Sequence, residues 1–169
     1  MELLRHNKER AKYLLNYHCR VIIMKASHLF VVYEELLNAK FSVGTLIVQE
    51  AGELLDFESF ASLAVCKDLK RAIFLGDKNQ YTSTFGCETL EKISNLGQSM
   101  FTRLQNLGYP TIKLHSQGAS RKEIVDLYKS KYPELKSYCG AGNNAKLPGV
   151  DKPVQWVDLH SKEVIIPFI

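Results

Sequence analysis

Short apolar runs alternate along the chain with segments that have the period of an amphipathic helix. The apolar runs predict short strands at residues 20–24, 43–48, 71–75, 111–114, 154–158 and 163–166. The amphipathic segments predict helices at residues 2–16, 27–38, 56–67, 98–105 and 121–131. Ser27 and Asp56 are candidate caps for two of these helices. This alternation predicts an α/β fold built on a parallel sheet.

Two long stretches lack such a period. Residues 76–97 are rich in Thr, Ser and Gly, which predicts a loop for most of their length. Residues 139–153 are rich in Gly, Asn and Pro, and they predict a linker or a surface loop.

Two of the predicted strands end in an acid. Glu50 follows the strand at 43–48, and Asp77 follows the strand at 71–75. A parallel strand that is buried on both faces has an unbroken apolar run, and ligand chemistry gathers just past its carboxyl end. Asp77 comes 27 positions after Glu50, which leaves room for one crossover helix. We therefore expect two neighbouring parallel strands that present both acids at one edge.

Acids in this position suit phosphate chemistry. Glu50 could orient and deprotonate a water that attacks a phosphate, with a neighbouring acid holding magnesium. In this chain the neighbour is Gln49, whose amide oxygen is neutral and a poorer ligand for a hard cation. Gly76 would allow a close backbone approach, and Gln80 could sense a terminal phosphate. The competing interpretation is structural, because solvated strand ends often carry acids.

Three downstream segments add a family resemblance. They are 98–104 (QSMFTRL), 108–114 (GYPTIKL) and Gln117-Gly118. With the two acid-tipped strands, they make the chain resemble superfamily 1 RNA helicases. More narrowly, it is similar to the Aquarius group, the intron-binding spliceosomal helicases and their fungal relatives. The resemblance covers most of residues 8–158.

The resemblance implies a fold and a set of partners. The fold would be a RecA-like three-layer parallel sheet of the P-loop NTPase type, here incomplete. Residues 1–115 would be the later part of the first helicase lobe and residues 116–169 the beginning of the second. An intact relative would be an ATP-dependent RNA helicase that uses ATP and Mg²⁺. Its implied partners are RNA (a pre-mRNA intron) and spliceosomal proteins, and its implied location is the nucleus.

The resemblance also assigns roles to residues. Glu50 would activate water, and Asp77 and Gln80 would couple the γ-phosphate to RNA. The implied nucleotide-binding residues are Gln49, Gln80, Gln117 and Arg121. The implied RNA-binding residues are Lys122 and Lys129.

Several departures weaken the case for activity. Gln49 replaces the magnesium-binding acid, and Glu53 replaces a family glutamine. Ala119 and Ser120 follow Gly118, where the family has a phosphate-contacting arginine. The 169 residues contain no G-x-x-x-x-G-K-[ST] motif and no Gly-Lys dipeptide, so they supply no phosphate-cradling loop.

These departures leave three interpretations. The favoured one is a fragment or degenerate member of an Aquarius-like RNA helicase that is inactive alone. The alternative is a non-catalytic pseudo-helicase scaffold for protein contacts in a ribonucleoprotein. The third is an active ATPase within a longer chain.

Composition adds little to these interpretations. With 46% hydrophobic and 24% charged residues the chain is in the ordinary globular range, and its net charge of +4 permits an acidic partner such as RNA. No apolar run approaches the ~18 residues of a membrane span. The four cysteines are widely spaced and predict reduced thiols, and the histidines lack metal-ligand spacing. We expect Phe101 and Trp156 to be core anchors.

Overall fold

The computed structural model divides into two compact units, Met1–Thr111 and Ile112–Ile169. It describes residues 6–39 and 42–138 and, beyond these, residues 140, 142, 148–150, 152, 154–156, 158 and 160. The assignment of residues 1–115 and 116–169 to two helicase lobes stays a prediction.

The first unit is built around two parallel strands. Its elements are α1 (Asn7–Tyr17), α2 (Ala26–Asn38), β1 (Thr45–Val48), α3 (Asp56–Val65), β2 (Arg71–Phe74), α4 (Glu88–Ser94) and α5 (Met100–Asn106). β1 pairs in parallel with β2, and Ile47 lies opposite Ile73. Because α3 connects the two strands, the prediction of neighbouring parallel strands joined by a crossover helix is confirmed.

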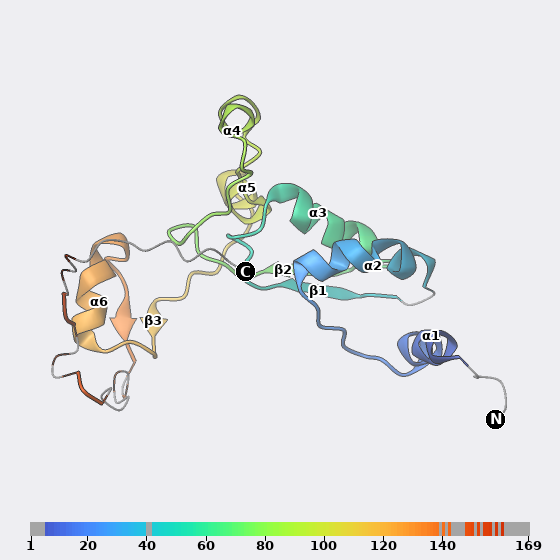
Figure 1. Ribbon diagram of the computed structural model, residues 1–169, viewed down its shortest axis with the longest axis horizontal. Helices are drawn as coiled ribbons and strands as arrows, with labels where there is room; N and C mark the ends of the chain where they lie inside the picture. Colours follow the sequence, from blue (N-terminus) through green and yellow to red (C-terminus); the bar gives the residue numbers. More distant parts are fainter. Residues whose placement is uncertain are drawn as a thin grey trace. The chain divides into compact units, whose positions relative to one another are not determined.

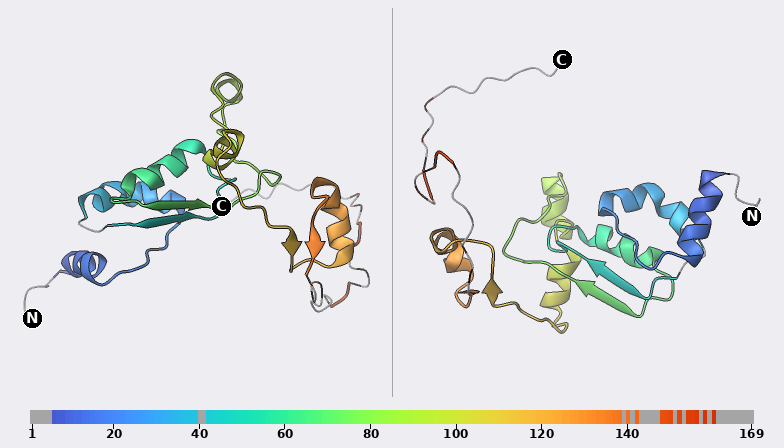
Figure 2. Two further views of the ribbon diagram at one scale, coloured as in Figure 1. Left: turned by 180° about the vertical axis from the view of Figure 1, so that it is seen from behind. Right: turned by 90° about the horizontal axis from the view of Figure 1, so that it is seen from below.

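The main core lies between α2 and α3, which run side by side over one face of the strand pair (Figures 1 and 2). Leu29 and Leu36 of α2 are buried together with Val65 of α3. Val32 and Tyr33 pack against the same cluster. This spacing of three and four residues gives α2 a continuous apolar stripe, and each fully buried leucine contributes roughly 1.5–3 kcal/mol.

A second, smaller core lies where the strands end. Val48 and Ala51 are buried against Phe101 of α5, which confirms the prediction that Phe101 is a core anchor. The side chain of Ser99 caps α5 by accepting a hydrogen bond from the backbone N–H of Thr102 at 3.2 Å. This core holds α5 against the carboxyl end of β1.

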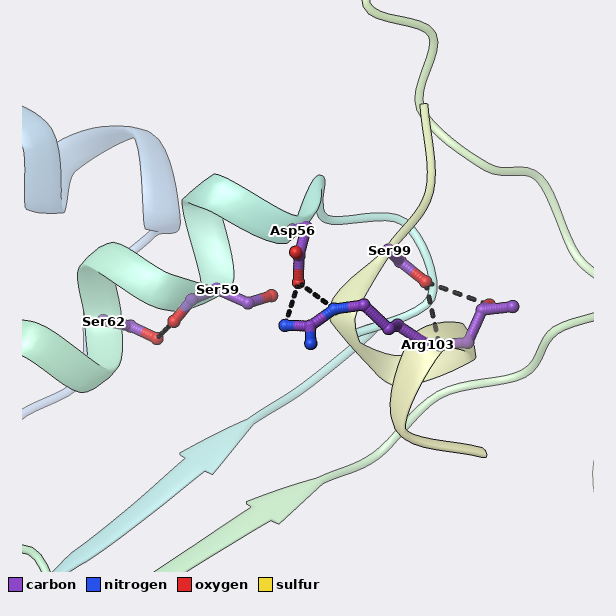
Figure 3. A network of polar contacts seen from close by, with 6 residues as sticks. Asp56, Ser59, Ser62, Ser99 and Arg103 are labelled. Carbon is purple, nitrogen blue, oxygen red and sulfur yellow. Dashed lines mark hydrogen bonds and ion pairs between the residues drawn. The ribbon is translucent and has the colours of Figure 1, made fainter. Parts of the chain in front are cut away.

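A polar contact joins α3 to α5 (Figure 3). Arg103 donates from Nε and Nη2 to one carboxylate oxygen of Asp56, at 3.2 and 3.0 Å. Both side chains are 41% exposed, so we expect this ion pair to stabilise the fold by less than about 1 kcal/mol. Asp56 is not the cap that the sequence predicted, because it is the first residue of α3 itself. Leu55 occupies the cap position, and its N–H donates to the Glu58 carboxylate at 2.8 Å.

Only one face of the strand pair is well covered. Ile47 is 61% exposed and Ile73 is 43% exposed, and they share a face because they are directly paired. The prediction that these strands are buried on both faces is therefore wrong for this structure. The structure is mixed α/β with short parallel strand pairs, and the three-layer sheet stays a prediction.

Two predicted strands are absent from this structure. Residues 20–24 and 111–114 have no regular secondary structure. Ile23 is 91% exposed and Ile112 is 92% exposed. An apolar run forms a strand only when a neighbouring strand satisfies its backbone, and neither run is paired in the part of the chain described.

The predicted helices differ at their ends. α1 ends at Tyr17, and residues 2–5 of the predicted helix lie outside the described residues. α2 begins at Ala26 with Lys25 at its cap position, so Ser27 is not the cap. α4 lies inside the predicted loop at 76–97. Its first turn carries two acids, and an ion pair of 2.6 Å joins Glu88 to Lys92 one turn later.

The second unit contains β3 (Ser116–Gln117), α6 (Lys122–Tyr128), a 3₁₀ turn η1 (Lys129–Lys131) and β4 (Lys136–Ser137). β3 and β4 pair in parallel, and Val125 of α6 is buried. Lys113 donates to Glu134 at 2.8 Å. This hydrogen bond and the Lys113 charge, helped by His115, lower the pKa of the Glu134 carboxyl.

Three predictions concern the C-terminal part of the chain. Trp156 is 96% exposed, so the prediction that it is a core anchor is wrong. Residues 154–156 and 158 form no strand, residue 157 lies outside the described residues, and so does the predicted strand at 163–166. Most of the loop predicted at 139–153 also lies outside them.

The α2–α3 core predicts a clear difference between two substitutions on one helix. Leu29→Ala removes a buried side chain and should lower the free energy of unfolding by about 2–4 kcal/mol. Val31→Ala changes a side chain that is 78% exposed and should alter it by less than about 0.5 kcal/mol. Urea denaturation of the full chain measures both. Equal effects would show that α2 does not pack as described.

Candidate functional site

The two acid-bearing turns lie side by side at one edge of the strand pair. The backbone pairing continues past the strands, because Leu75 N–H donates to the carbonyl of Val48 at 2.8 Å. Ala51 N–H then donates to the carbonyl of Leu75, also at 2.8 Å. The turn that begins at Gln49 is therefore held against the turn that leads to Asp77.

Two glycines make this approach possible. A Cβ atom on Gly76 would lie 2.7 Å from the backbone nitrogen of Gly52. A Cβ atom on Gly52 would lie 2.9 Å from the carbonyl oxygen of Asp77. Real side chains do not tolerate such distances to backbone, so both positions require glycine in this arrangement. The sequence pointed to close approach at Gly76 but missed Gly52, whose only signal was a glycine directly after a strand-end acid.

Glu50 occupies an unusual backbone conformation. Its φ angle is 52°, in the left-handed region that costs a non-glycine residue about 1–2 kcal/mol. The Glu53 N–H donates to the Glu50 carbonyl at 2.9 Å and closes the turn. The side chains of Gln49 and Glu50 are exposed, so the turn presents them to solvent.

Asp77 and Gln80 are brought together. One carboxylate oxygen of Asp77 accepts the N–H of Asn79 at 2.9 Å, and the other accepts the Gln80 amide at 3.3 Å. This is the local pattern by which an aspartate shapes a turn. The adjoining segment is tied to the first turn, because Ser83 donates its hydroxyl to the carbonyl of Glu53.

The remaining predicted site residues belong to the second unit. The Gln117 amide oxygen accepts the N–H groups of Ala119 (3.1 Å) and Ser120 (2.8 Å). Its amide nitrogen donates to the Ser120 carbonyl at 3.1 Å and to the Ser137 hydroxyl at 2.8 Å. Gln117 therefore closes a turn and links β3 to β4. The nucleotide contact predicted for it stays a prediction.

The basic residues of this unit lie around α6. Arg121 is at the N-cap position, and a Cβ atom on Gly142 would approach its Cα within 3.0 Å. Lys122 begins the helix and Lys129 follows it, and both side chains are exposed. They are seven positions apart, so they lie on the same side of this helical stretch.

The donor atoms at the acid edge do not fit a magnesium ion held by protein carboxylates. Gln49 offers a neutral amide, and both carboxylate oxygens of Asp77 already accept hydrogen bonds. Within the part of the chain that the structure describes, no three His, Cys, Asp or Glu side chains are grouped for metal binding. What the edge does offer is the exposed carboxylate of Glu50 and the half-buried carboxylate of Asp77, which is hydrogen-bonded to the exposed Gln80 amide.

Comparison with known proteins places this geometry in context. The chain is 33% identical over 140 residues to RNA helicase aquarius of Mus musculus, which covers 79% of this chain and 10% of that protein. It is 29% identical over 114 residues to NFX1-type zinc finger-containing protein 1 of Mus musculus, covering 67% of this chain and 6% of that protein. The Homo sapiens protein of the same name is 28% identical over 127 residues, covering 75% and 6%.

These similarities are extensive in this chain but cover little of the other proteins. The chain spans about a tenth of the length of RNA helicase aquarius and less of the other two. No family model matches it. The chain is therefore related in part to Aquarius-like helicases, as the residue motifs predicted.

Two further properties bear on the site. No helix within the described ranges has the length and apolar character needed to cross a bilayer. Cys19, Cys66 and Cys87 are free thiols, and Cys139 lies outside the described residues. Burial raises the pKa of the Cys66 thiol, which favours its neutral, unreactive form.

The glycine contact predicts that the acid edge is sensitive to a single added methyl group. Gly76→Ala should lower the free energy of unfolding by about 1–3 kcal/mol, because the new Cβ meets rigid backbone. Gly44→Ala is the matched control, since nothing lies within 4 Å of its Cβ position at the other end of β1. It should cost less than about 0.5 kcal/mol. Urea denaturation compares the two, and equal values would contradict the close approach of the turns.

Proposed function

We propose that this chain is an Aquarius-like RNA helicase module that associates with RNA in pre-mRNA splicing in the nucleus and does not hydrolyse ATP by itself. The observation that carries the proposal is the relationship to RNA helicase aquarius over 79% of the chain. An alignment of that extent necessarily includes both acid turns, which lie in the middle of the sequence. The related region therefore contains the two turns that the backbone brings together.

The architecture supports this assignment. A β1–α3–β2 unit with acids past both strand ends is the arrangement expected in a RecA-like sheet. We propose that the exposed face with Ile47 and Ile73 is covered by a further layer in the assembled helicase fold. On this proposal, residues 1–115 belong to the first lobe and residues 116–169 to the second.

The lack of activity follows from the donor chemistry. ATP hydrolysis needs a phosphate cradle, a metal and a positioned water. Glu50 retains the exposed carboxylate that could orient a water. Gln49 removes the metal-binding charge, and the 169 residues contain no phosphate loop. One of three requirements is therefore met by the residues of this chain.

RNA association is proposed from charge and family together. Lys122 and Lys129 are exposed on one side of the α6 region, and the whole chain has a net charge of +4. Phosphate contacts from such lysines are independent of base sequence. The intron of a pre-mRNA and spliceosomal proteins would be the partners by analogy with the Aquarius group.

A non-catalytic scaffold is the second candidate. It is favoured by Gln49 and by the Gln117 amide, whose oxygen and nitrogen both form hydrogen bonds within the second unit. On this reading the fold is kept for protein contacts within a ribonucleoprotein and RNA binding is not required.

Nucleotide titration tests the loss of ATP chemistry. A fluorescent ATP analogue with Mg²⁺ should bind the chain with a dissociation constant no lower than ~100 μM, which corresponds to a binding free energy of about −5.5 kcal/mol. An active ATP-dependent RNA helicase in the same assay shows that the analogue reports binding. A tighter complex with this chain would contradict the proposed inactivity.

RNA titration separates the two candidates. Single-stranded RNA should bind the full chain at low salt and dissociate as salt rises, because lysine–phosphate contacts release counterions. The double variant Lys122→Ala/Lys129→Ala should bind at least about fivefold more weakly, and the salt slope should fall. Lys70→Ala, an exposed lysine of the first unit, is the control and should change little. If the unaltered chain does not bind RNA even at low salt, the scaffold is the better description.

A further inference from the structure

The first unit carries an exposed aromatic surface, whose apolar side chains differ from the polar ones at the acid edge. We define it as Phe30 of α2, Phe57 and Phe60 of α3, Phe85, and Leu96. The four phenylalanine side chains are 42%, 46%, 64% and 38% exposed. The ring centres of Phe30 and Phe57 are 6.4 Å apart, and those of Phe57 and Phe85 are also 6.4 Å apart in an edge-on arrangement. Three separate chain segments thus contribute to one aromatic row.

The aromatic surface borders a small hollow. The hollow has a volume of about 300 Å³ and lies between the start of α3 and the end of α4. Its lining is Asp56, Phe57, Phe60, Ser94, Asn95 and Leu96. Asn95 has a φ angle of 52°, which ends α4 and turns the chain toward Leu96. The hollow is large enough for one apolar side chain of a binding partner, with rings on one side.

The position of this surface on α3 explains why it stays exposed. α3 directs Ala61 and Val65 toward the α2–α3 core. Phe57 lies one turn before Ala61 and its ring is 6.4 Å from that of Phe30 of α2, but neither Phe57 nor Phe60 belongs to the core, and they stay 46% and 64% exposed. Aromatic side chains grouped around a hollow are typical of the buried centre of a protein interface.

The surroundings of the aromatic surface are acidic. Segments 53–60 and 85–96 contain five carboxylates (Glu53, Asp56, Glu58, Glu88 and Glu91) and one cation, Lys92. Lys92 already pairs with Glu88, and Arg103 from α5 pairs with Asp56. Glu91 accepts the backbone N–H of Phe85, which holds a carboxylate next to an aromatic residue of the surface.

The negative charge of these segments contrasts with the net charge of the whole chain, which is +4. An acidic border repels nucleic-acid phosphates and attracts lysine and arginine. The aromatic rings therefore do not suit base stacking at this place, since a stacked strand would bring its phosphates to the carboxylates. Charge complementarity selects a basic protein segment.

We infer that the aromatic surface binds a protein segment that carries an apolar anchor side chain flanked by lysine or arginine. The anchor enters the hollow beside Phe57 and Phe60, and the basic residues meet the carboxylates of Glu53 and Glu91. This inference goes beyond the proposed function, because it requires neither ATP nor RNA and does not use the carboxylates of Glu50 and Asp77.

The test uses the full chain and three labelled model peptides in fluorescence anisotropy. The first peptide has leucine and lysine at amphipathic helical spacing. The second replaces lysine by glutamate, and the third replaces leucine by serine. The leucine–lysine peptide should bind at least tenfold more tightly than either control. Equal binding of the leucine–glutamate or the serine–lysine peptide would overturn the inference.

Variants locate the binding to the aromatic surface. Phe57→Ala/Phe60→Ala should weaken the leucine–lysine peptide at least tenfold. Tyr17→Ala removes a 73% exposed aromatic side chain of α1 outside the surface and should leave binding unchanged. Glu53→Gln/Glu91→Gln should weaken binding at least threefold and reduce its salt dependence. Phe60→Ser serves as a second variant if the double alanine variant loses its cooperative urea transition.

Two other occupants are outcomes of the same experiment. If an oligouridine RNA displaces the peptide, and its own binding is lost in Phe57→Ala/Phe60→Ala, the surface is a nucleic-acid site and the inference is wrong. If the chain alone shows concentration-dependent sedimentation that the same variant abolishes, the surface binds a second copy. Either result is independent of the ATP titration, so failure here leaves the proposed function standing.

Discussion

The backbone contact between Gly52 and Gly76 is the constraint on which the acid edge depends. Two parallel strands bring their carboxyl ends to one edge in any case, but they do not bring the following turns into contact. Here Gly76 passes so close to the Gly52 nitrogen that a single Cβ would collide. The left-handed backbone of Glu50 and the Asp77–Gln80 turn lie on either side of that contact. The acid edge is thus defined by backbone geometry, and it persists although the donor set around it does not fit a metal.

Local chemistry made part of the fold predictable. The strand–helix–strand unit around α3 was readable from sequence because apolar runs, helical spacing and the 27-position separation all indicate one arrangement. The runs at 20–24 and 111–114 looked equally apolar, yet Ile23 and Ile112 are almost fully exposed. Whether these runs form strands depends on a neighbouring strand to pair with, and a short stretch of sequence does not show whether one is present. Helix α4 was missed for the opposite reason, since it is short and buries no residue, and its two first-turn acids and its Glu88–Lys92 pair help to stabilise it.

The sequence predicted where the candidate site lies better than it predicted the contacts within that site. Acids after two neighbouring strands were enough to expect that Glu50 and Asp77 share an edge. The need for glycine at position 52 could not be predicted, because it arises from the close approach of two turns that are distant in sequence. Nor could the sequence show that the Gln117 amide forms its hydrogen bonds within the second unit. Trp156 failed as a core anchor because aromatic character favours burial only where a neighbouring surface exists to receive it.

The two candidate binding surfaces of this chain lie in different units. Four phenylalanines from three segments of the first unit are exposed, and two of them, Phe57 and Phe60, line a hollow. The neighbouring segments are acidic although the whole chain has a net charge of +4. The lysines expected to meet RNA lie in the other unit, on and beside α6. The proposed RNA contacts and the proposed protein contact therefore use different residues, and neither requires the ATP chemistry that Gln49 argues against.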